Sequence, residues 1–231
     1  MTTTYHNDPK FRSDYIAECR WHREQDLIIQ SSYGDPEKSD FRGCHNGCAA
    51  HSLLRLKGFK ISGSDKFGVA EALGWPIWLV RLAESIFEGL PNKDAKEFPQ
   101  QLAQAIPCGA NVDMVWPKLA LWLLGDTEKG VIRFAKTDQA KKSVNDVTAL
   151  YREWVDSGVS PAIEKWRAAA AAYAYANAAA YAAAAAAAAY AYANAAANAA
   201  AYAAAAADAR RTHWKATRDK LLNLLAETSI T

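Results

Sequence analysis

The sequence predicts an all-α protein, made of a helical globular body followed by one long alanine-rich helix. The run from Ala168 to Ala207 has no charged residue and consists of alanine, tyrosine and asparagine. Alanine has the highest helix propensity, and the run has no Gly or Pro to interrupt a helix. Before this run, apolar residues recur three and four positions apart between Gly and Pro residues. Sustained two-residue alternation is absent, although residues 131–134 form a short ambiguous run.

The body is expected to span residues 1–159 and to begin with a helix. Asn7-Asp8-Pro9 is a typical helix start, with a side-chain acceptor before a proline in the first turn. We expect this helix to end near Ser32 and a polar loop to follow over residues 33–42. A second, shorter helix is then predicted from Cys44 to Leu56, stopping at Gly58.

Four further helical patterns follow in the body, over residues 76–88, 94–106, 111–124 and 138–154. In the first of them an apolar stripe lies opposite a charged side that carries Arg81, Glu84 and Glu88. A solvated face of ion pairs is the expected role of these three charges.

The last helix is predicted to start at Ser160-Pro161 and to reach about Leu225, within a region of residues 160–231. Tyrosines and asparagines cover most of one side of this helix and leave the opposite side as nearly bare alanine. Small side chains let helices approach closely, and the leucines at its end need an apolar partner. The residues expected to make these contacts are Tyr173, Tyr175, Asn177, Tyr181, Tyr190, Tyr192, Asn194, Asn198, Tyr202, Leu221 and Leu225.

The charge balance excludes strong electrostatic partners. The chain has 27 Lys and Arg against 25 Asp and Glu, a net charge of +2, which predicts neither nucleic-acid nor anionic-membrane binding. A membrane span is not expected, because alanine drives insertion weakly and Asn194 opposes it. The polar start and only 4 Cys indicate a cytoplasmic protein with reduced thiols.

A cluster of Cys and His is the one chemically distinctive feature of the body. Cys44, Cys48 and His51 would share one face of a helix, and Cys19 and His22 would share a face of the first helix. Thiolate sulfur and neutral imidazole are ligands that zinc prefers, so these five residues are the candidate zinc ligands. Two other readings stay open: buried thiols with hydrogen-bonded histidines, or a Cys nucleophile with a His base.

Three segments resemble a group of uncharacterised proteins of phages and bacteria. They are GCHNGCAAH at residues 43–51, LAESIFEGLP at residues 82–91, and AIPCGA at residues 105–110, which leads to Trp116 and Trp122. The resemblance covers about residues 5–155, and some members of the group carry alanine-rich tails. It implies a phage or mobile-element context and assigns no catalytic residue.

The function expected first is therefore that of a non-enzymatic accessory protein, packing or self-assembling through its alanine-rich helix. Its partner would be another protein or a second copy of the chain, with no cofactor needed. The alternative is a zinc-binding or thiol-dependent enzyme centred on Cys44, Cys48 and His51. The common nucleotide-binding and hydrolase motifs are absent from the sequence.

Overall fold

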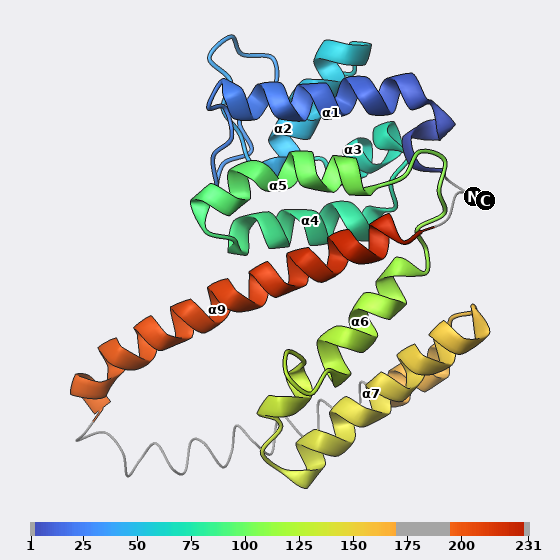
Figure 1. The fold of residues 1–231 in the computed structure, drawn as a ribbon, viewed down its shortest axis with the longest axis vertical. Coiled ribbons are helices and arrows are strands. Elements are labelled where there is room, and N and C mark those ends of the chain that lie inside the picture. The colour runs from blue at the N-terminus through green and yellow to red at the C-terminus, as the bar shows by residue number, and fades with distance from the viewer. Residues whose placement is uncertain (1–2, 170–194, 229–231) are drawn as a thin grey trace. The chain divides into compact units, whose positions relative to one another are not determined.

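A computed structural model describes residues 3–169 and 195–228 (Figure 1). Within these residues the fold is all-α, as predicted, and the only β-type pairing is an isolated bridge between Ile28 and Gly43. Residues 163–169 are helical as well. The other helices are η1 (Thr4–Asn7), α1 (Pro9–Glu24), α2 (His45–Lys57), α3 (Lys66–Leu73), α4 (Ile77–Gly89), α5 (Asn92–Ala105), α6 (Val115–Gly125), η2 (Val131–Phe134), α7 (Asp138–Ser157) and α9 (Ala195–Ala226).

The first helix begins as predicted but is shorter. The Asp8 carboxylate accepts a hydrogen bond from the Phe11 N–H at 2.9 Å, which caps α1. The helix ends at Glu24 rather than near Ser32, because Asp26 takes a left-handed conformation with φ of 54°. Lys96 and Arg42 both pair with the Asp26 carboxylate and hold this turn.

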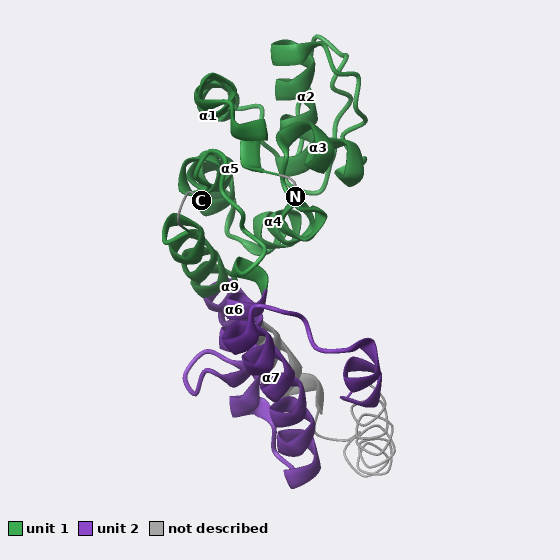
Figure 2. Cartoon of the chain, turned by 90° about the vertical axis from the view of Figure 1, so that its right-hand side faces the viewer, with its two compact units in different colours: residues 1–116, 214–231 green, residues 117–213 purple. Residues whose placement is uncertain are grey.

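The chain divides into two compact units (Figure 2). Unit 1 comprises Met1–Trp116 and Trp214–Thr231, and unit 2 comprises Pro117–His213. This division differs from the boundary expected between residues 159 and 160, since the end of α9 belongs to the same unit as the N-terminal helices. Leucines in that end supply apolar surface that unit 1 buries.

The core of unit 1 is centred on aromatic side chains from its first residues. The Tyr5 ring is fully buried and lies edge-on to Phe11 and Trp75, with ring centroids 6.3 and 5.7 Å away. Its hydroxyl donates to the Ala103 carbonyl at 2.9 Å. This bond ties the N-terminal turn to α5, and α1 packs against both α2 and α5.

The end of α9 lies beside α4 and α5 of unit 1. The Trp214 indole occupies the space where a Cβ on Gly89 would lie, so the last turn of α4 needs glycine there. Asp94 at the start of α5 pairs with Lys215 and Arg218, both at 3.1 Å. Further along α9, the side chains of Leu221, Leu224 and Leu225 are buried.

Replacing Asp94 with Asn is expected to lower the free energy of unfolding by about 1 kcal/mol, because one partly exposed carboxylate holds two cations. The loss should shrink in high salt, which screens such pairs. Chemical denaturation of the parent protein and the variant at low and high salt measures this loss of stability. Asp146→Asn, which removes the single exposed pair with Lys142, is the control and should change stability less. Equal losses for the two variants would refute the special role of Asp94.

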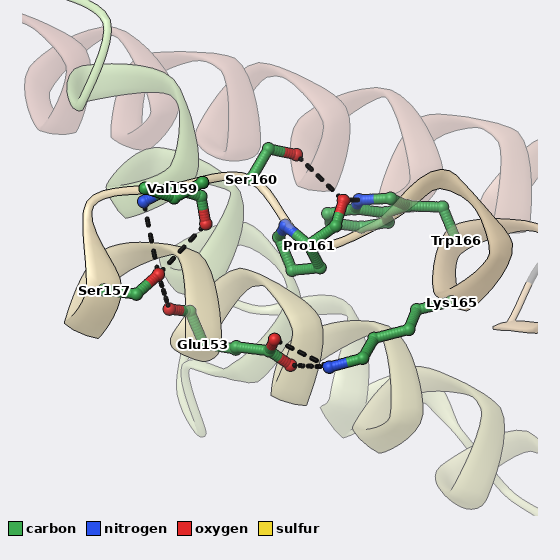
Figure 3. A network of polar contacts seen from close by, with 7 residues as sticks. All are labelled: Glu153, Ser157, Val159, Ser160, Pro161, Lys165 and Trp166. Atoms are coloured by element: carbon green, nitrogen blue, oxygen red, sulfur yellow. Dashed lines mark hydrogen bonds and ion pairs between the residues drawn. The ribbon is translucent and has the colours of Figure 1, made fainter.

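In unit 2 a polar network joins the end of α7 to the next helix (Figure 3). The Lys165 ammonium pairs with the Glu153 carboxylate at 2.7 Å, and the Trp166 indole N–H donates to the Pro161 carbonyl at 3.1 Å. Ser157 and Val159 are hydrogen-bonded at the turn between the two helices. The helix predicted to start at residues 160–161 therefore starts at residue 163, after this turn.

The alanine-rich region is described only in part. The helices over residues 163–169 and Ala195–Ala226 agree with the expected secondary structure at both ends. The single continuous helix predicted between them falls on residues 170–194, which lie outside the described residues. Among the helices in the described part of the chain, none combines the length and apolar character needed to cross a membrane.

Candidate functional site

The two histidines of the predicted zinc set meet at the contact between α1 and α2. His22 Nε2 lies 2.9 Å from His51 Nδ1, and His22 Nδ1 lies 2.8 Å from the Glu18 carbonyl oxygen. Donation of the Nδ1–H to Glu18 leaves His22 Nε2 as the acceptor for His51. The sequence contained no argument that would place these two helices side by side, and the structure does so.

The His22–His51 pair has the character of a buried hydrogen-bonded pair. Burial, mainly, lowers the pKa of His22 to about 4, although its bond to the Glu18 carbonyl acts in the other direction. Burial also lowers the pKa of His51. Both rings are therefore neutral at neutral pH, and the His22 ring is nearly perpendicular to the rings of Phe41 and Trp21.

The predicted thiol ligands do not gather around these histidines as one group. Burial raises the pKa of Cys19 to about 12 and that of Cys48 well above its usual value. The Cys48 thiol donates to the Gly43 carbonyl at 3.3 Å. Within the described residues, the only group of three or more metal-ligating side chains is Cys44 with Glu84 and Glu88.

Cys44 thus lies with two glutamates of α4. One ligand atom from each of Cys44, Glu84 and Glu88 lies within 4.8 Å of the others. Cys44 is the N-cap residue of α2, while Glu84 and Glu88 are one turn apart on α4. The three side chains line a pocket of about 230 Å³, which Ser31, Ser32 and Tyr33 complete.

Main-chain hydrogen bonds hold both glutamates in this pocket. The Asn46 N–H at the start of α2 donates to Glu84 at 3.0 Å. The Ser31 N–H donates to both oxygens of Glu88 at 3.1 and 3.0 Å. Ser31 has a φ of 66°, a left-handed conformation that costs energy for a residue other than glycine. The strained residue is therefore the one that fixes Glu88.

The segment before Ser31 connects the pocket to the end of α4. The Gln30 amide donates to the carbonyl oxygens of Phe87 and Leu90 at 2.8 and 3.0 Å. On the other side, the Cys44 N–H donates to the Ser32 carbonyl at 2.6 Å. Residues 30–32 therefore fix the end of α4 against the start of α2.

The Cys44 thiol and the Glu84 carboxyl group both have raised pKa values. Burial, followed by the nearby Glu84 carboxylate, raises the pKa of Cys44 to about 12. Burial also raises the pKa of Glu84, although hydrogen bonds from Cys44 and Asn46 lower it in part. Cys44 is a protonated thiol at neutral pH, which disfavours a free thiolate nucleophile and leaves a ligand that a metal ion can deprotonate.

The expectation of a solvated ion-pair face on α4 is wrong for Glu84. This side chain is only 8% exposed, and within the described residues neither Glu84 nor Glu88 has an ion-pair partner. Arg81 instead lies over the Phe67 ring, 5.1 Å from its centroid. The sequence does contain a signal for the burial of Glu84, because Val80, Glu84 and Glu88 are four residues apart. This spacing places the two acids on the same face of the helix as the buried Val80.

The residues expected to mediate assembly fall into two sets. Leu221 and Leu225 are fully buried in unit 1, so they contact the same chain. Tyr173, Tyr175, Asn177, Tyr181, Tyr190, Tyr192 and Asn194 lie outside the described residues, and so do the side chains of Asn198 and Tyr202.

Comparison with known protein families, curated proteins and solved structures finds no match to this chain. The resemblance to phage and bacterial proteins therefore stays a prediction.

Proposed function

We propose that this protein binds a divalent transition-metal ion, with zinc as the reference ion, through Cys44, Glu84 and Glu88. The observation that carries the proposal is the convergence of one thiol and two carboxylates within 4.8 Å in a pocket. Zinc accepts thiolate and carboxylate ligands together, at about 2.3 Å to sulfur and about 2.0–2.2 Å to oxygen. Small shifts of the three side chains would bring all of them to one ion.

The identity of the ligands argues for zinc or a similar ion rather than for magnesium or calcium. Those harder ions take oxygen ligands in sets of six or more, whereas here one of the three ligand atoms is a sulfur. With three protein ligands, a tetrahedral ion would have one position left for a fourth ligand. A three-ligand set with an open position is typical of catalytic zinc sites, and four ligands are typical of structural ones.

The binding environment also supports the proposal. The Glu84 carboxylate is desolvated, and its raised pKa reflects the cost of an unpaired buried charge. A dication would relieve that cost and would favour the thiolate form of Cys44. Neighbouring backbone N–H groups already orient both glutamates, as the supporting shell of a metal site does.

Zinc binding to the full chain is expected at one ion per chain, measured by equilibrium dialysis with elemental analysis under reducing conditions. Cys44→Ser and Glu84→Gln should each weaken zinc binding by at least about tenfold, because each removes one of only three ligands. Cys108→Ser is the matched control, since Cys108 is a half-exposed thiol of the same unit outside the pocket. It should leave the affinity unchanged.

His51→Asn distinguishes this site from the set first expected in the sequence. If zinc used His22, His51 and the neighbouring thiols, His51→Asn would weaken binding and Glu84→Gln would not. That result, or the absence of any stoichiometric zinc binding, would overturn the proposal.

Packing or self-assembly through the alanine-rich helix remains a separate prediction. The side chains of its tyrosines and asparagines lie outside the described part of the structure, so the geometry adds nothing to it. The candidate metal centre lies entirely within unit 1 and does not depend on that prediction.

A further inference from the structure

A second pocket in unit 1, of about 490 Å³, lies apart from the candidate metal centre. It is formed by η1, the loop after α2 and the outer side of α3, and it shares no lining residue with the pocket at Cys44. Its walls include the side chains of His6, Phe59, Ile61 and Glu71. Phe59 is 45% exposed, so part of its aromatic surface is open to a ligand.

Three successive residues in the left-handed conformation present His6 to this pocket. Tyr5, His6 and Asn7 have φ values of 54°, 52° and 58°. Side chains other than glycine disfavour this conformation, so a run of three needs strong tertiary support. Tyr5 supplies it through its buried ring and its hydroxyl bond to Ala103. Strained backbone of this kind is concentrated at ligand sites.

A contact across the pocket fixes the imidazole of His6. His6 Nε2 lies 3.1 Å from the Ala72 carbonyl oxygen on α3, to which it donates in the neutral ring. Nδ1 of that tautomer is an acceptor. That tautomer offers a lone pair and an aromatic face to a ligand.

One carboxylate at the pocket, that of Glu71, has no ion-pair partner among the described residues. The Lys60 ammonium pairs with Glu37 at 2.7 Å, so its charge is neutralised. Among the described residues, the exposed Glu71 carboxylate has no hydrogen-bond or ion-pair partner. One unpaired negative charge beside an exposed aromatic ring and Ile61 is complementary to a cation with an apolar body.

We propose that this pocket binds a small organic cation, an ammonium group attached to a flat apolar body. The ammonium group pairs with Glu71 and donates to His6, and the apolar body packs on Phe59 and Ile61. Neither a metal ion nor the alanine-rich helix is required, so this inference stands independently of the proposed function.

The test uses 2-phenylethylammonium as the probe and the full chain in amide NMR titrations. We expect saturable shifts at residues 59–61 and 68–72, with a dissociation constant on the order of 1 mM for so small a ligand. The neutral analogue 2-phenylethanol should bind at least about fivefold more weakly, because it lacks the charge. Phenylacetate, with the opposite charge, should not bind.

Two variants assign the binding to the named residues. Glu71→Gln should weaken binding of the probe by about fivefold. Phe59→Ala should weaken binding further, because the stacking surface is lost. Glu24→Gln, which neutralises an exposed carboxylate on α1, is the matched control and should not change the affinity. Equal binding of phenylacetate and the ammonium probe, shifts elsewhere in the chain, or an unaltered affinity in Glu71→Gln would each overturn the inference.

Discussion

Acidification from about pH 7 to about pH 5 is expected to lower the free energy of unfolding, and two buried histidines should each contribute roughly 2 kcal/mol to this loss. Burial lowers the pKa of both His22 and His45 from 6.5 to about 4. The unfolded chain therefore takes up protons near pH 6.5, whereas the folded protein resists them. The contribution of the two neutral histidines to the free energy of unfolding is therefore complete above pH 6.5 and is lost progressively as the pH falls toward 4.

A substitution of His45 tests this loss of stability at low pH. The centroid of the His45 ring lies 6.2 Å from that of Phe87 and 5.9 Å from that of Phe98, and its Nδ1 has no hydrogen-bond partner among the described residues. His45→Leu should reduce the acid sensitivity, measured by urea denaturation at each pH, by the contribution of one histidine, roughly 2 kcal/mol. An identical pH dependence in His45→Leu and the parent protein would contradict the account.

Gly47→Ala is expected to destabilise unit 1 by at least about 3 kcal/mol and to abolish zinc binding. A Cβ at this position would lie 1.8 Å from the Tyr33 carbonyl oxygen, far too close for two non-bonded atoms. The clash involves main chain on both sides, so the segment bearing Ser31 and Ser32 would have to move. That segment holds Glu88 and Cys44 in the pocket.

Gly58→Ala is the matched control for Gly47→Ala. Gly58 caps α2 with a φ of 71°, and a Cβ there would meet no atom within 4 Å. The substitution therefore adds only the cost of the left-handed conformation, about 1 kcal/mol. Thermal unfolding followed by circular dichroism, with zinc dialysis in parallel, compares the two. Equal losses of stability, or a Gly47→Ala variant that retains zinc, would show that the close contact at Tyr33 does not shape the site.

Local signals in the sequence predicted much of the helical fold. Asp8 and Pro9 mark the start of α1, and the expected helix from Cys44 to Leu56 agrees with α2 within one residue at each end. The prediction missed α3, because it is short and Gly68 interrupts its helical pattern. It extended the first helix past Asp26, whose left-handed conformation depends on the distant residue Lys96 and on Arg42.

Of the three residues of the candidate site, the sequence predicted only Cys44 as a metal ligand. Cys44 stood out because of its neighbours Cys48 and His51, which suggested a site on one helix face. Glu84 is about 40 residues away, and nothing local indicates that it lies under the start of α2. The contact depends on tertiary packing, namely the hydrogen bond from Asn46 to Glu84 and the anchoring of α4 by Gln30.

Cobalt substitution tests the central claim most directly, because a thiolate bound to Co²⁺ gives a ligand-to-metal charge-transfer absorption. Titration of the reduced, metal-free full chain with Co²⁺ should produce this band at one equivalent. Cys108→Ser should retain the band, Glu84→Gln should weaken it, and Cys44→Ser should lack it. A band that persists in Cys44→Ser, or no band in the parent protein, would contradict a metal centre at Cys44, Glu84 and Glu88.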